Sequence, residues 1–212
     1  MNSYPAWLIV LSKGLSLVFH PLLMLTYTLI FLIWANPYEF GGGTLDMHTL
    51  KIIQVFFLTF GLPTISLILM KAMGLIPNLY LENPKDRIIP YVSTGVFYLW
   101  LSVNAYFTPI FPHTFTVICI GATVALFMAF IANIGSKVSL HAVGMGGMMA
   151  ICFIAMIQFS YQDITVIFLG VIILAGAVGT ARLILGAHEL REVVSGYVIG
   201  MIGQMAALFF LT

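Results

Sequence analysis

Seven runs of mainly apolar residues constrain this chain more than any other feature of its sequence. A helix needs about 20 apolar residues to cross a hydrocarbon core of roughly 30 Å. The strands of an outer-membrane barrel would instead alternate apolar and polar residues, which these runs do not do. We therefore predict an all-α fold, a polytopic transmembrane helical bundle of six or seven spans, with candidate spans at 14–35, 51–73, 89–108, 112–133, 138–159, 164–186 and 191–211.

The composition also indicates an integral membrane protein. Of the 212 residues, 61% are hydrophobic and only 7% are charged, whereas roughly a quarter of the residues of a soluble domain are charged. The formal net charge of +1 provides no basic face that could displace counterions, so no nucleic-acid partner is expected. Membrane lipids are the expected partners, and the oligomeric state is left open.

The connections between the runs indicate a single domain, 1–212. Asn36–Thr49 and Tyr161–Asp163 are short or rich in glycine, and no linker long enough to separate two domains is seen in the sequence. The first and last runs are the least certain spans, and Lys13 and the pair His20–Pro21 interrupt the first. The pair predicts a kink, and an opening segment that lies partly at the interface would leave six spans.

The few charges are unevenly distributed between the two ends of the predicted bundle. Counting alternate crossings leaves only Lys51 near one face and places seven basic residues at the other. Cytoplasmic loops are enriched in lysine and arginine, so we expect the basic face and the N-terminus to be cytoplasmic. The same face collects His141, His188 and Glu192, which the orientation of a span does not require. The seven basic residues are Lys13, Lys71, Lys85, Arg87, Lys137, Arg182 and Arg191.

The stretch ARLILGAHELREVVSG places four ionisable side chains between the last two runs. Arg182 and His188 would lie on different sides of a continuous helix, and Gly186 can end a helix between them. His188 and Glu192 are four residues apart, so they share a helix face. The carboxylate can then bind one imidazole nitrogen and leave the other free to attack a substrate. The alternative is a simple ion pair at a helix end.

Two further motifs precede apolar runs on the same face. In SKVSLHAVG, Ser139 and the backbone amides of a helix start can bind an anion, and His141 can donate a proton to a leaving oxygen. In NPKDRIIPY, Lys85 and Arg87 precede the third run. Cations together with a nucleophilic and an acidic histidine suit phosphoryl transfer through a phosphohistidine. His141 could instead be a polar residue satisfied inside the bundle, and the two cations could be plain loop charges.

From about residue 71 to the end, the order and spacing of these motifs resemble the type 2 phosphatidic acid phosphatase (PAP2) superfamily. The last motif is similar to the signature SR-x5-H-x3-D, VSLHA is similar to PSGHA, and KDRIIP loosely resembles K-x6-RP. The resemblance implies that no metal or other cofactor is required. It assigns catalytic roles to His188, His141 and Glu192, and phosphate binding to Lys85, Arg87, Ser139 and Arg182.

The motifs also depart from the superfamily pattern. Ala181 stands in place of serine, Leu140 in place of glycine and Glu192 in place of aspartate, and Arg87 is not adjacent to Pro90. Many members act at the outer face of the bacterial inner membrane. An inner-membrane location is therefore expected here, although the charge distribution places the site at the cytoplasmic face.

We predict a membrane-integral lipid phosphatase that hydrolyses a phosphate or pyrophosphate monoester of a lipid, whose apolar tail stays in the bilayer. The alternatives are a lipid phosphotransferase and a non-catalytic lipid-binding or transport protein on the same scaffold. His20, His48 and His113 are expected to lie outside the site. The glycines near residue 146 are expected to permit close helix packing, or else to make room for a lipid chain.

Overall fold

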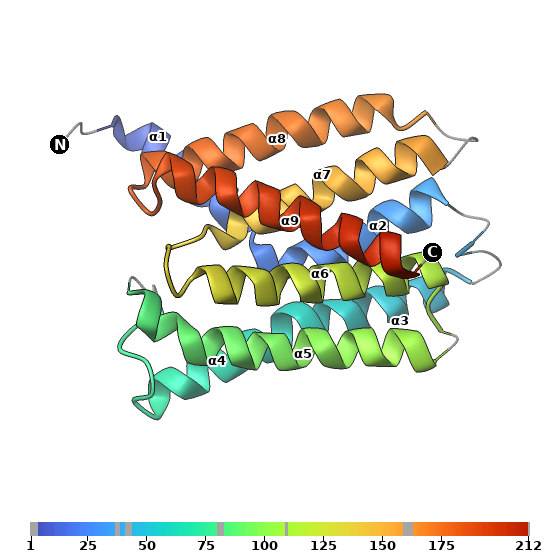
Figure 1. The fold of residues 1–212 in the computed structure, drawn as a ribbon, viewed down its shortest axis with the longest axis horizontal. Helices are drawn as coiled ribbons and strands as arrows, with labels where there is room; N and C mark the ends of the chain where they lie inside the picture. Colours follow the sequence, from blue (N-terminus) through green and yellow to red (C-terminus); the bar gives the residue numbers. More distant parts are fainter. Residues whose placement is uncertain are drawn as a thin grey trace.

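The apolar runs fold into long helices that lie side by side (Figure 1). The computed structural model describes residues 4–36, 39–40, 44–79, 83–108, 110–158 and 163–211. Within these ranges the helices are α1 (Ala6–Val18), α2 (Met24–Ala35), α3 (Leu45–Phe56), α4 (Leu62–Ala72), α5 (Ile88–Phe107), α6 (His113–Ala132), α7 (Leu140–Gln158), α8 (Thr165–Ile184) and α9 (Leu190–Leu211), with shorter turns at η1 (Pro21–Leu23), η2 (Phe57–Gly61) and η3 (Pro84–Arg87).

Seven helical stretches within the described ranges are long and apolar enough to cross a membrane, which confirms the predicted fold class. The predicted connections Asn36–Thr49 and Tyr161–Asp163 lie partly outside the described residues, as does the last residue of the expected span 138–159. The seven stretches are Ala6–Ala35, Leu45–Ala72, Lys85–Phe107, His113–Ala132, Leu140–Gln158, Thr165–Ile184 and Leu190–Leu211.

The first span is broken at the predicted position. Helix α1 ends at Val18, and the His20 side chain accepts a hydrogen bond from the backbone amide of Leu22 at 3.4 Å. Pro21 then opens the short turn η1 before α2 begins. Because proline has no amide hydrogen and fixes its φ angle, it suits the first position of a new helical segment. The break lets α1 pack along α8 while α2 enters the centre of the bundle.

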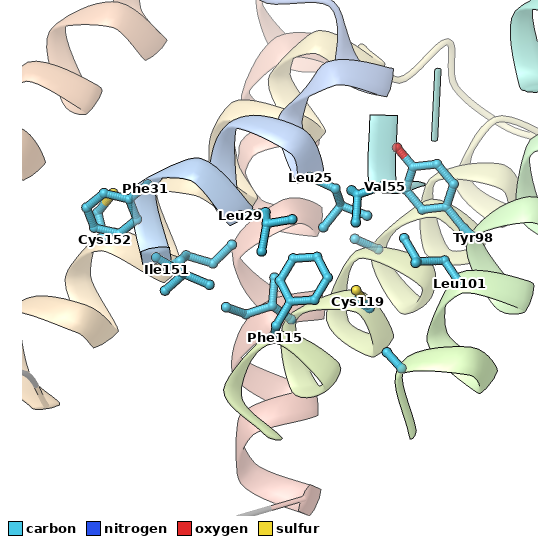
Figure 2. Close-up of a cluster of buried hydrophobic side chains, with 14 of the residues drawn as sticks. Leu25, Leu29, Phe31, Val55, Tyr98, Leu101, Phe115, Cys119, Ile151 and Cys152 are labelled. Carbon is cyan, nitrogen blue, oxygen red and sulfur yellow. The ribbon is translucent and has the colours of Figure 1, made fainter. Parts of the chain in front are cut away.

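An apolar core fills the middle of the bundle. Figure 2 shows side chains from several helices meeting there, among them Leu29 of α2, Phe115 of α6 and Ile151 of α7. Phe115 and Leu29 are fully buried. Cys119 and Cys152 belong to the same cluster and are unbonded packing residues.

Helices α7 and α9 are packed against each other through backbone atoms. A Cβ atom added at Gly200 would collide with the carbonyl oxygen of Val143, and one added at Gly146 would collide with the carbonyl oxygen of Tyr197. At Gly196 an added Cβ would lie 2.7 Å from a carbonyl oxygen of the facing segment. Glycine is therefore required at these positions, as expected for close helix contact in a membrane.

The three motifs identified in the sequence lie at one end of the bundle. The connections from α4 to α5, from α6 to α7 and from α8 to α9 are all at the end where α1 begins, on the left of Figure 1. The connections from α2 to α3 and from α5 to α6, and the C-terminus, are at the other end. The alternation of the spans thus gathers segments that are far apart in the sequence.

Candidate active site

His188 is placed by the turn that separates α8 from α9. Gly186 has a φ angle of +61°, a left-handed conformation that favours glycine. Its amide donates to the carbonyl oxygen of Leu183 at 3.0 Å, and the amide of Ala187 donates to that of Arg182 at 3.1 Å. This pair of bonds is a Schellman motif, which ends α8 as the sequence predicts and directs the next residues back over the bundle.

The His188 imidazole is held through one nitrogen. Its Nδ1 atom lies 3.0 Å from the carbonyl oxygen of Lys137 and 3.2 Å from Oε2 of Glu192. Both of these atoms are acceptors, so Nδ1 carries the hydrogen and donates to them. The Nε2 atom of the neutral ring therefore keeps its lone pair, which is the form that a nucleophilic histidine requires.

The surroundings keep this imidazole neutral. Burial is the largest cause that lowers the pKa of His188, and it is followed by the positive charge of Arg182; Arg87 acts in the same direction. The hydrogen bonds to Lys137 and Glu192 act in the opposite direction, and the net pKa is about 4. At neutral pH the ring therefore carries no charge.

Glu192 supports the histidine and the start of α9 with the same oxygen. Its Oε2 atom also accepts a hydrogen bond from the amide of Glu189 at 3.1 Å, the contact that an acidic residue makes in a capping box. The Glu192 residue is 8% exposed. Its backbone carbonyl accepts a hydrogen bond from the amide of Ser139 at 3.1 Å, so α9 is tied to the start of α7.

A cavity of about 280 Å³ opens beside these residues. Four of the side chains predicted from the sequence line it, namely Arg87, His141, Arg182 and His188. They come from the end of η3, the start of α7, the end of α8 and the turn before α9. The cavity therefore joins two arginines and two histidines that the sequence separates by up to about a hundred residues.

Ser16 of α1 holds two of these side chains. The Nε2 atom of His141 lies 3.0 Å from the Ser16 carbonyl oxygen, and Nη1 of Arg182 donates to the Ser16 hydroxyl at 3.2 Å. Because a carbonyl only accepts, Nε2 of His141 carries a hydrogen and Nδ1 is the nitrogen that can exchange a proton with a ligand. The Ser16 side chain is buried, which shields both bonds from water.

Two buried polar atoms of the cavity wall have no hydrogen-bond partner within the described ranges. They are Nε of Arg182 and the hydroxyl of Tyr91. An unsatisfied buried polar group costs about 1–3 kcal/mol, and such groups are rare in native proteins. Both can donate a hydrogen bond, so an anionic oxygen in the cavity would satisfy them.

The remaining predicted residues lie apart from the cavity wall. Lys85 is exposed and lies two residues before the wall residue Arg87. Ser139 is fully buried, and its hydroxyl accepts a hydrogen bond from the amide of Ala142 at 3.5 Å. Its position suits a residue that caps α7. Glu192 acts on the cavity only through His188.

Two residues of the cavity wall were not predicted from the sequence. His20 was expected to mark a kink outside the site, but it also lines the cavity, with its ring edge-to-face against His141 at a centroid distance of 5.6 Å. No local pattern could have placed it there. Tyr91 follows Arg87 by four residues on the same helix face, so helical spacing could have indicated it.

The described residues include no group of three or more His, Cys, Asp or Glu side chains that could hold a metal ion. Comparison of the chain with protein-family models, with curated proteins and with solved structures finds no match. The superfamily resemblance of the three motifs therefore stays a prediction, and the geometry of the cavity is what supports a function.

Proposed function

We propose that this protein is a membrane-integral lipid phosphatase that hydrolyses a phosphate or pyrophosphate monoester through a phosphohistidine. The observation that carries the proposal is the shared cavity of Arg87, His141, Arg182 and His188. A phosphate group there would be paired with two guanidinium groups, and its oxygens could accept from Nε of Arg182 and the Tyr91 hydroxyl. The neutral imidazole of His188 supplies the nucleophile.

In the first step, Nε2 of His188 attacks phosphorus and forms a P–N bond while the P–O bond to the lipid breaks. The phosphate monoanion brings one proton into the cavity, which Nδ1 of the neutral His141 ring accepts and passes to the leaving oxygen. Nδ1 of His188 keeps its hydrogen throughout and shares the developing positive charge with the Glu192 carboxylate. Arg87 and Arg182 stabilise the negative charge on the three phosphoryl oxygens that do not leave.

In the second step, water hydrolyses the phosphohistidine. Nδ1 of His141, which gave up its proton, now accepts one from the attacking water. The oxygen of that water bonds to phosphorus, the P–N bond breaks, and inorganic phosphate leaves with His188 restored. The bond between Nε2 of His141 and the Ser16 carbonyl holds the ring orientation in both steps.

The test is phosphate release from a panel of lipid phosphates by the parent protein and by His188→Ala. His113→Ala is the matched control, because His113 is exposed at the other end of the bundle. We expect release by the parent and the control, loss in His188→Ala, and an acid-labile phosphoryl label on the parent. Activity of His188→Ala equal to that of the parent would refute the assigned nucleophile.

Two other outcomes would replace the proposal. If the parent transfers the phosphoryl group to another lipid, and labelled water leaves no label in the product phosphate, the protein is a phosphotransferase. If the parent releases no phosphate from phosphatidic acid, lysophosphatidic acid, alkyl phosphates or polyprenyl pyrophosphate but binds them, it is a lipid-binding or transport protein.

We also propose that the protein lies in a bacterial inner membrane with the cavity end at the cytoplasmic face. The excess of basic residues at that end supports this orientation. Lys85 is exposed in the α4–α5 connection, so Lys85→Cys provides a probe beside the site. The native Cys119 and Cys152 are buried. Labelling of Lys85→Cys by an impermeant thiol reagent in intact cells would overturn the cytoplasmic assignment.

A further inference from the structure

The cavity continues far beyond its charged end. Along α7 its wall residues run from Leu140 to Ile151, eleven residue steps, which at about 1.5 Å per residue correspond to about 16 Å. Thr28 of α2 and Gln204 of α9 line the deep part. The charged side chains are all near the shallow end, so the cavity is polar at its mouth and apolar in its depth.

The polar residues of the deep part bond to the protein itself. The Thr28 hydroxyl donates to the carbonyl oxygen of Met24 at 2.8 Å, and the Gln204 amide donates to that of Ile118 at 3.3 Å. The Thr28 hydrogen and one of the two Gln204 amide hydrogens are therefore used within the protein. Apart from Tyr98 of α5, the rest of the deep wall is made of hydrocarbon and small residues, so it suits the apolar chain of a ligand. The wall includes Met24, Leu25, Ala122, Leu126, Gly147 and Met148.

The dimensions match one lipid chain. A bilayer with a hydrocarbon core of about 30 Å gives each leaflet about 15 Å, close to the depth of about 16 Å that the helical rise gives for the cavity. The volume of about 280 Å³ is slightly below the range of about 300–1,000 Å³ for pockets that bury a drug-sized ligand. This space suits one slender chain and not a pair.

We infer that the protein takes a single-chain lipid phosphate, such as a lysophosphatidic acid or an alkyl phosphate, and seats its chain inside the bundle. This inference rests on the proposed function and specifies its substrate class. It differs from the sequence-based expectation that the tail stays in the bilayer. The phosphate lies between Arg87, Arg182 and His188, and the chain extends between α2, α5, α6 and α7 toward Ile151.

The chain site can be tested without any turnover. The probe is dodecylphosphonate with a diazirine on its last carbon, bound to His188→Ala in lipid nanodiscs and photolysed. We expect the label on the deep wall, at Met148, Ile151 or Thr28. A label confined to the outward-facing side of α5, where Trp100 is exposed, would overturn the inference.

Matched substitutions on α6 test the same point. Ala122 lines the cavity and Val124 is exposed on the outer side of the helix. We expect Ala122→Leu to lower the deep labelling about tenfold, because the added side chain occupies the chain's space, and Val124→Leu to leave it unchanged. Equal labelling in the two variants would overturn the inference.

Gly147→Ala is a second variant for the case that Ala122→Leu does not fold. Its added Cβ would meet nothing closer than 3.7 Å, so the helices need not move. We expect Gly147→Ala to lower the deep labelling by roughly threefold, because the added methyl group narrows the cavity. Labelling equal to that of the parent in this variant counts against the chain site.

Competition between lipids and the probe tests how many acyl chains the cavity holds. Lysophosphatidic acid should displace the probe at a concentration about tenfold lower than phosphatidic acid does, since the second chain has no place in the cavity. Equal displacement would overturn the single-chain assignment. If the protein is labelled on the deep wall but releases no phosphate, the proposed hydrolysis is refuted and the site for the lipid chain stands. If the protein releases phosphate but is labelled only on its outer surface, the site for the lipid chain is refuted and the proposed hydrolysis stands.

Discussion

Replacing Glu192 by glutamine tests how the nucleophile is held. Both side-chain contacts of Glu192, to Nδ1 of His188 and to the amide of Glu189, use the single oxygen Oε2. A glutamine can therefore present its one carbonyl oxygen to both donors. The carbonyl oxygen of Lys137 remains as a second acceptor for Nδ1 at 3.0 Å. The variant thus loses a negative charge and keeps the hydrogen-bond geometry.

The size of the effect follows from these contacts. A hydrogen bond to a charged group contributes about 1.5–3 kcal/mol and a neutral one about 0.5–1.5 kcal/mol, so the change costs about 1–1.5 kcal/mol. At about 1.4 kcal/mol per factor of ten, Glu192→Gln should lower kcat for phosphate release by about tenfold. Glu192→Ala also removes the bond to Glu189, and we expect it to lower kcat by about a hundredfold.

The assay compares these variants at neutral pH with Glu189→Gln, whose side chain is 69% exposed and pairs with Arg191, which is 79% exposed. We expect the control to keep the parent's kcat, and thermal unfolding to show that Glu192→Gln folds normally. A loss of about a thousandfold or more in Glu192→Gln would mean that the Lys137 carbonyl does not hold the ring. An unchanged kcat would mean that the carboxylate plays no part in the reaction.

Three further predictions follow from other contacts. Arg182→Lys keeps the charge but loses the guanidinium fork bonded to Ser16, so KM should rise about tenfold in steady-state assays; an unchanged KM would contradict this role. The pKa of His188 is about 4 in the folded protein against an ordinary 6.5. As the pH falls, the unfolded chain therefore binds the proton first, and the free energy of unfolding should decrease between pH 6.5 and 4. The decrease should be smaller in His188→Asn; an equal dependence of the unfolding temperature on pH in the two proteins would refute this. Gly200→Ala should destabilise the bundle by about 1–3 kcal/mol, whereas Gly176→Ala, with nothing within 4 Å of its added Cβ, should not; equal unfolding temperatures would refute the close packing.

The spans and their ends were predictable because membrane helices obey local rules. Apolar length identified the seven spans, and the single glycine at 186 identified the turn that positions His188. The pairing of His188 with Glu192 follows from their spacing of one helical turn. These features depend on residues that are close in the sequence.

The details of the cavity wall were not predictable from local patterns. His20 reaches the cavity because the break at Pro21 turns α2 into the bundle, and the sequence shows the break but not its direction. Ser139 fits an anion-binding pattern, yet the packing of α7 on α9 buries it as a helix cap. Whether a charged residue such as Lys85 points inward depends on side-chain placement at the membrane interface, where long side chains can extend toward water.

The glycine contacts between α7 and α9 restrict how this protein can change over evolutionary time. The atoms that would block a larger residue at Gly146 or Gly200 belong to the main chain of the opposite helix. In many crowded cores a larger residue is tolerated because a neighbouring side chain becomes smaller. A main-chain carbonyl group is present in every residue, so no second mutation can make room for a larger residue at these two glycines. His141 and His188 stand at the starts of these two helices. The distance between them is therefore set by the main-chain contact of α7 and α9, and it should stay the same in relatives whose surrounding side chains differ.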